Sequence, residues 1–177
     1  MTSSDLAYRF SVPSASAGNQ LAQAVLEDSL GGYLSTTDWL GAAPEDLFET
    51  MSGDDNAAEV SKYRCLFVVN KHASESLTSV KLWFTAQDTG GSAYAVGVDP
   101  TVASAMNSGV QQALKTTGSY VAPAGVTFSA PSDKTSGVSV GTLSPGQTRA
   151  IWVRRTGTDS ARKVGEIFSV RFEGYVE

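Results

Sequence analysis

The sequence predicts an all-β protein, an antiparallel β-sandwich of immunoglobulin-like type, and three observations favour this fold. Seven short apolar segments with strand-like composition follow one another after residue 62. Gly, Pro and Ser separate these segments as they separate strands at turns. The chain of 177 residues is 41% hydrophobic and 18% charged, as expected for a packed globular core. Seven strands at this spacing favour two packed antiparallel sheets over alternating strands and helices.

The first predicted strand of the sandwich spans residues 63–70, YRCLFVVN. Both of its alternating faces are apolar, so we expect a central strand that is covered on both sides. Cys65, the only cysteine, is expected to pack in the core as a small apolar side chain. The next strand, at residues 80–86, alternates apolar with more polar residues, and we expect it to be half-buried and antiparallel to the first.

Five further strands are predicted in the segments AYAVGVDP, GVTFSAP, GVSVGTL, TRAIWVRR and EIFSVRFEGY. In TRAIWVRR, alternation places Trp152 and Arg154 on one outward face, and Arg155 follows at the end of the strand. Trp and Arg are favoured contact residues, so these side chains predict a packing surface for a partner. A second interpretation stays open, in which Trp152 covers the N-terminal region of its own chain.

Residues 99–119 interrupt the strand pattern and predict a short helical insertion near 100–116. Asp99 suits an N-cap and Pro100 suits the first helical position. Four apolar residues then recur at every fourth position, as on one face of a helix, although Gly109 weakens the pattern: Val102, Met106, Val110 and Leu114.

Residues 1–60 form a predicted N-terminal extended arm, and residues 61–177 form the sandwich domain. The arm holds one short helical pattern, GNQLAQAVLEDSL, followed by turn-rich sequence with isolated large apolar residues. Such a segment rarely forms its own core, so we expect it to lie on the sandwich or on another subunit. Residues 1–62 carry ten acidic and two basic side chains in a chain of net charge −5, which could attract the arm to the more basic remainder. Two solvated surfaces are an equally open interpretation.

The residues that most chemistry requires do not cluster in the sequence. His72 is the only histidine, and no nucleophile motif accompanies it. The run SGDDNAAE lacks calcium-loop spacing, and no phosphate-binding glycine motif occurs. The acidic net charge argues against nucleic-acid binding, and no apolar run long enough to span a membrane and no signal peptide is present. We therefore expect no enzyme activity, no cofactor, no metal site, no nucleic-acid partner and no membrane partner.

Residues 47–172 resemble a family of small structural proteins encoded among the virion genes of tailed bacteriophages. The resemblance rests on LFETMSGDDNAAEVSKYRCLFVVN, on AVGVDP, and on the block PAGVTFSAPSDKTSGVSVGTLSPGQTRAIWVRR. These are strand and turn residues, so the resemblance carries over no catalytic residue. The helical insertion and the longer N-terminal region depart from the family pattern.

The resemblance implies an immunoglobulin-like virion protein, made in the host cytoplasm and placed on the capsid surface. We expect a capsid decoration or cement protein that contacts the major capsid protein or other virion proteins and forms a homo-oligomer, with a trimer preferred. The expected contact residues are Trp39, Leu40, Leu47, Phe48, Trp152, Arg154 and Arg155. Two alternatives stay open: a neck, tail or baseplate protein, and a glycan or receptor-binding module whose aromatic platform would comprise Trp83, Tyr94, Tyr120 and Trp152.

Overall fold

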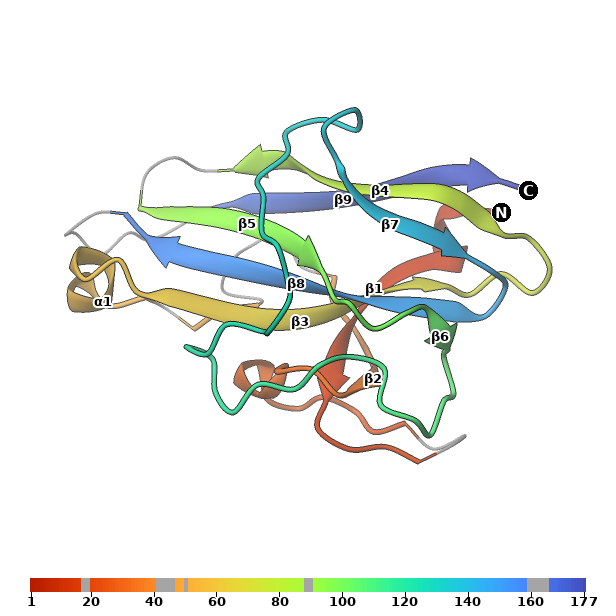
Figure 1. Ribbon diagram of the computed structural model, residues 1–177, viewed down its shortest axis with the longest axis horizontal. Coiled ribbons are helices and arrows are strands. Elements are labelled where there is room, and N and C mark those ends of the chain that lie inside the picture. Colours follow the sequence, from red (N-terminus) through yellow and green to blue (C-terminus); the bar gives the residue numbers. More distant parts are fainter. Residues whose placement is uncertain (17–19, 41–46, 50, 88–90, 159–165) are drawn as a thin grey trace.

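Two antiparallel sheets pack face to face in the computed structural model, which describes residues 1–16, 20–40, 47–49, 51–87, 91–158 and 166–177 (Figure 1). The larger sheet has the order β2-β1-β3-β8-β5, with β6 on β8, and its strands are β1 Leu6–Val12, β2 Tyr33–Asp38, β3 Ser61–Asn70, β5 Ser92–Val98, β6 Ser104–Ala105 and β8 Gln147–Gly157. The smaller sheet has the order β7-β4-β9, formed by β7 Val138–Leu143, β4 Leu77–Gln87 and β9 Phe168–Val176. The predicted all-β antiparallel sandwich is confirmed.

The main core fills the space between the two sheets. Strand alternation sends one face of each strand into this space, as sandwich packing requires. Its fully buried members include Leu66 and Val68 from β3, Leu82 from β4, and Ile151 and Val153 from β8. Trp39, Leu47 and Phe48 from the N-terminal region belong to the same cluster, so this region is part of the sandwich core.

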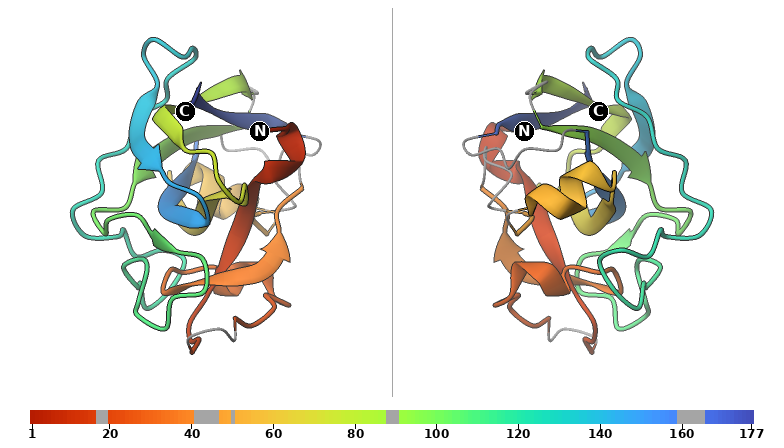
Figure 2. Two further views of the ribbon diagram at one scale, coloured as in Figure 1. Left: turned by 90° about the vertical axis from the view of Figure 1, so that its right-hand side faces the viewer. Right: turned by 90° about the vertical axis from the view of Figure 1, so that its left-hand side faces the viewer.

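A second core lies on the other face of the larger sheet, which is why β3 is apolar on both faces. Cys65 and Phe67 point into it beside Trp152 of β8, and all three side chains are fully buried. The N-terminal segment and the segment after β5 cover this face, and Gln112 N–H donates to the Gly32 carbonyl between them (Figure 2). The predictions of a central strand covered on both sides and of a core Cys65 are confirmed.

The pairing of the strands corrects several expectations. The N-terminal region is not an arm, because β1 pairs with β3 and β2 pairs with β1 within the larger sheet. β3 and β4 do not pair with each other: β3 pairs with β1 and β8, whereas the chain crosses to the smaller sheet before β4. The segment 125–131 forms no strand. It makes an isolated bridge between Ser129 and Val96 of β5, and its Pro131 carbonyl accepts from Phe84 N–H of β4.

The helical expectations are also wrong. Residues 100–116 contain no helix, and their only regular element is the two-residue β6, which pairs with β8. Val102 and Val110 are 72% and 75% exposed, so the four-residue spacing does not mark a buried helical face. In the N-terminal pattern, the described residues form only the 3-10 turn Leu26–Asp28. Elsewhere in the described residues, the helices are the 3-10 turn Ser3–Asp5 and α1, Gly53–Ala57, whose N-cap Ser52 accepts from Asp55 N–H.

Candidate protein-binding edge

The structure does not bring the expected contact residues together on one surface. Trp39 is 6% exposed, and three others are fully buried: Leu47, Phe48 and Trp152. Leu40 alone is open to solvent, at 90% exposure. Arg154 is half-buried, with its guanidinium 5.3 Å from the centroid of the Phe128 ring, and Arg155 is buried. Alternation assigned Trp152 to the correct face of β8, but other segments of the chain cover that face.

Trp152 covers its own chain, the interpretation that the sequence left open. It packs in the second core with Leu34 of β2 and with Ala113. Its indole N–H donates to Asp99 Oδ2 at 2.8 Å. The same carboxylate accepts from Leu114 N–H at 3.1 Å and, through Oδ1, from Thr101 N–H at 2.8 Å. Asp99 is therefore the anchor of residues 99–116 and not a helix N-cap.

The basic residues at the beginning of β3 form ion pairs inside the protein. Lys62 Nζ lies 2.8 Å from Glu49 Oε1, and Arg64 Nη2 lies 2.5 Å from Glu49 Oε2. Partial burial of Glu49 opposes ionisation, but the hydrogen bond from Lys62 and the charge of Arg64 outweigh it and hold the pKa of this carboxyl below its usual value. The two buried cations thus share Glu49, and Asp55 Oδ2 lies 3.7 Å from Lys62 Nζ as a second carboxylate.

Arg155 closes a second buried polar cluster at the same end. Its guanidinium donates to Glu166, to Ser92 Oγ at 2.9 Å and to the Glu49 carbonyl at 3.1 Å. Tyr94 O–H also donates to Glu166, at 3.1 Å. Burial, which outweighs the charge of Arg155, raises the pKa of Tyr94 well above its usual value. Arg155 thus stabilises the interior and does not reach a partner.

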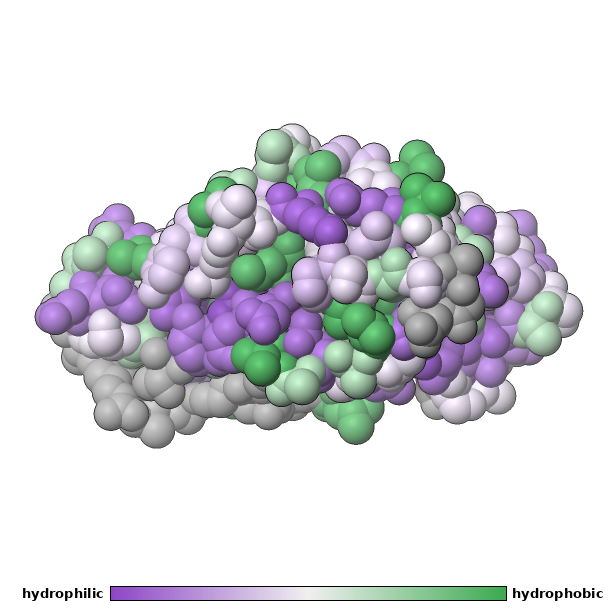
Figure 3. Space-filling view, turned by 90° about the horizontal axis from the view of Figure 1, so that it is seen from below, coloured by the Kyte–Doolittle hydropathy of each residue, from purple (hydrophilic) through white to green (hydrophobic). Residues whose placement is uncertain are grey.

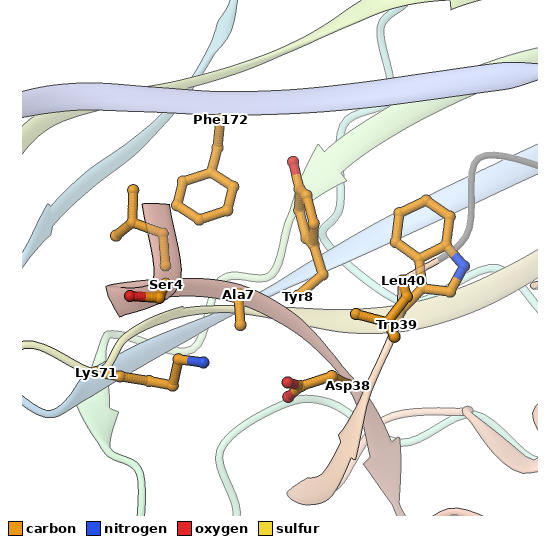
Figure 4. Close-up of a pocket in the computed structure, with 9 residues that line it drawn as sticks. Ser4, Ala7, Tyr8, Asp38, Trp39, Leu40, Lys71 and Phe172 are labelled. Atoms are coloured by element: carbon orange, nitrogen blue, oxygen red, sulfur yellow. The ribbon is translucent and has the colours of Figure 1, made fainter. Parts of the chain in front are cut away.

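On one side of the molecule, β1 of the larger sheet lies next to β9 of the smaller one, with the Tyr8 ring 4.9 Å from that of Phe172. A pocket of about 400 Å³ opens there (Figure 4). Aromatic and aliphatic side chains form much of its wall, and Asp38 and Lys71 stand at its rim; the lining residues are Ser4, Leu6, Ala7, Tyr8, Asp38, Trp39, Leu40, Lys71 and Phe172. We call this the Tyr8 pocket.

Two buried donors of the Tyr8 pocket have no hydrogen-bond partner within the described parts of the chain. They are the Tyr8 hydroxyl and the Trp39 indole Nε1. The Tyr8 ring packs edge-on against Trp39 and Phe172, with centroid distances of 5.6 and 4.9 Å. Burial raises the pKa of the Tyr8 phenol well above its usual value. Since an unpaired buried donor costs free energy, these groups distinguish the pocket from an ordinary apolar hollow.

A second pocket, of about 410 Å³, continues the first along β9. The two pockets share Leu6 and Phe172, and the second also includes Gly174 and Val176 of β9. Within the described ranges β9 pairs with β4 alone, so its other side is a free strand edge. We call β9 with its two pockets the β9 edge. The sequence predicted the β9 strand but neither β1 nor the pockets, which depend on how β1 approaches β9.

The other edges of the larger sheet are covered by neighbouring segments. Val96 of β5 exchanges backbone hydrogen bonds with Ser129. On the opposite side of the sheet, Thr36 of β2 donates its N–H to the Leu21 carbonyl. The face that includes these N-terminal segments shows separate apolar areas among polar ones and no single large apolar patch (Figure 3). The β9 edge is therefore a better candidate for a protein contact than the edges of the larger sheet. β7, at the other end of the smaller sheet, also pairs on one side only within the described residues, but it lines neither pocket.

The structure also bears on the aromatic platform that the sequence suggested for glycan or receptor binding. The aromatic platform is wrong, because Tyr94 and Trp152 are buried and only Tyr120, at 56% exposure, is open to solvent. Trp83 is 7% exposed and lies under Arg171. The described residues contain no cluster of three metal-ligating side chains, and none of their helices has the length and apolarity to cross a membrane.

Comparisons of the chain with protein-family models, with curated proteins and with solved structures found no match.

Proposed function

We propose that this protein is a structural component of a tailed-phage particle, acting as a capsid decoration or cement protein that stabilises contacts between major capsid subunits. The β9 edge is the observation that carries the proposal. A free strand edge lined by apolar pockets is suited to contact with a protein backbone and its side chains. The resemblance of residues 47–172 to virion structural proteins supplies the setting.

The character of the Tyr8 pocket supports binding over catalysis. Its walls are mainly hydrophobic, and Asp38 is held by Arg9, whose Nε lies 2.7 Å from Asp38 Oδ1. Lys71 is the other charged lining residue. No described histidine or cysteine lines either pocket, which also favours binding. His72 instead accepts backbone N–H groups from Ser74 and Glu75 through Nδ1.

Add-back to particles tests the proposal. Phage particles produced without this protein should be less resistant to heat and to chelation or low salt, and the purified protein should restore that resistance. Leu40→Asp places a charge at the rim of the Tyr8 pocket without disturbing the core, because Leu40 is 90% exposed. We expect Leu40→Asp to reduce particle occupancy at least tenfold at limiting concentration.

Val110→Asp is the matched control, because Val110 is 75% exposed on the segment after β5, away from β9. It should bind particles like the wild type. Equal occupancy for the two variants would remove the β9 edge from the proposal. Binding to isolated tails but not to heads would move the protein to a neck, tail or baseplate position. Absence from both would refute the particle assignment.

A further inference from the structure

We propose that the occupant of the β9 edge is a second copy of this chain. Two β9 strands would pair antiparallel across a twofold axis at Phe172, joining two three-stranded sheets into one continuous sheet with the order β7-β4-β9-β9-β4-β7. This inference identifies the partner at the edge and does not depend on the particle assignment.

Among the registers that place the twofold axis at residue 171, 172 or 173, the charge order of β9 is self-complementary only at Phe172. With the twofold axis at Phe172, Arg171 of each copy lies opposite Glu173 of the other, so the contact contains two opposite-charge pairs. Moving the axis to residue 171 would place Arg opposite Arg, and moving it to residue 173 would place Glu opposite Glu. Like charges directly opposite each other are unfavourable, so the charge order favours the Phe172 register over these two, and Phe172 keeps both charged pairs within β9.

Both charged side chains are already placed on the outer face of β9. Arg171 lies over the Trp83 ring, 5.8 Å from its centroid, and its Nη2 is 3.1 Å from Glu173 Oε2. Glu173 Oε1 also accepts from Lys134 Nζ at 2.6 Å. The Arg171 side chain is 61% exposed and that of Glu173 is 40% exposed, so both remain accessible to a second copy. Pairing would extend each two-residue contact into a four-residue network across the twofold axis.

The inner face of the same strand offers apolar area for the contact. Phe172 is half-buried and lines both pockets, so in the proposed register two Phe172 side chains meet at the axis with a pocket on either side. Val176, at 51% exposure, lies at the end of the strand and would be opposite Phe168 of the second copy. The contact would thus cover apolar surface that is open in the single chain.

A twofold contact through β9 makes the basic unit a dimer, in place of the trimer preferred from the sequence. A segment of another protein could also pair with a free edge, but it would not require the charge order of β9 to be its own complement. The self-complementary Arg171 and Glu173 pattern is therefore the reason to choose a second copy.

Sedimentation velocity over a concentration range tests the proposal on the full chain. We expect a reversible dimer for the wild type, with a Kd in the micromolar range. Arg171→Glu and Glu173→Arg each replace two attractive pairs by two repulsive ones, and each should raise Kd at least tenfold. The double variant Arg171→Glu, Glu173→Arg exchanges the charges and should return Kd to within about threefold of the wild-type value.

Asp54→Arg is the matched control for Glu173→Arg, because it makes the same change in net charge on α1, at the other end of the molecule (Figure 1). It should leave Kd unchanged, and thermal unfolding should show that all variants are folded. A wild-type protein that is monomeric up to about 100 µM would overturn the proposal. Single variants that dimerise like the control, or a double variant that fails to recover, would do the same. A dimer that does not bind particles would leave this inference intact and refute only the proposed function.

Discussion

Replacing Asp99 by alanine should destabilise the protein more than any other single carboxylate change on the segment after β5. The fully buried Asp99 side chain accepts hydrogen bonds from the Trp152 indole, from Leu114 N–H and from Thr101 N–H. A hydrogen bond to a charged group contributes about 1.5–3 kcal/mol, and three donors would lose their acceptor together. Because water would enter the space and satisfy some of them, we expect a loss of about 3–5 kcal/mol.

Urea unfolding at neutral pH measures this loss directly, and in a chain of this size it corresponds to a fall of roughly 10 °C in Tm. Asp133→Ala is the control, because the Asp133 carboxylate also accepts a backbone N–H, from Ser136 at 2.8 Å, but the contact is exposed to solvent. The control should lose less than about 1 kcal/mol. Hydrogen exchange at Leu114 should accelerate in Asp99→Ala and not in the control. Equal losses for the two variants would refute the assignment of Asp99 as the anchor of residues 99–116.

Three further predictions follow from the buried polar groups. Tyr8→Phe removes an unpaired buried hydroxyl, so it should raise the free energy of unfolding by about 1 kcal/mol; a loss of stability would show that the hydroxyl is satisfied. The pKa of Glu49 is held below its usual value of 4.5, so its stabilising effect is complete above that value and is lost as the pH falls through the folded-state pKa. Glu49→Gln should therefore flatten the loss of Tm between about pH 5 and pH 3, and an unchanged pH profile would contradict this. Burial raises the pKa of the Cys65 thiol well above its usual value, so it should react with a maleimide only after unfolding, and rapid labelling of the native protein would contradict its core position.

The sequence predicted the elements whose patterns follow directly from strand geometry. The apolar runs that became β3, β4, β5, β7, β8 and β9 are confirmed, because alternation of side chains reports burial on the faces of a strand. It did not predict that Leu6–Val12 and Tyr33–Asp38 join the same sheet, since their patterns are short and half-buried. Strand pairing between distant segments leaves little local trace in a sequence.

The errors at the site have one physical origin. Alternation places Trp152 on an outward face of β8 and Arg155 at its end, but the segment after β5 covers Trp152, and Arg155 forms a buried ion pair with Glu166. The four-residue spacing in residues 100–116 suggested a helix. The Asp99 carboxylate instead accepts hydrogen bonds from the backbone N–H groups of Thr101 and Leu114, and these hold the segment in a non-helical path. Tyr8 and Phe172 were missed because a pocket between two strands from opposite ends of the chain exists only in three dimensions.

The order of strands in the two sheets also governs how the chain can be assembled during synthesis. β8 lies between β3 and β5, and β9 lies beside β4, so each sheet lacks a strand until residues 147–176 have been made. Until then the earlier strands cannot complete their sheets, and β3 exposes apolar side chains on both of its faces. Long-range pairing of this kind folds slowly and exposes adhesive strands on the way, so a chain interrupted before β8 should aggregate and not persist as a smaller domain.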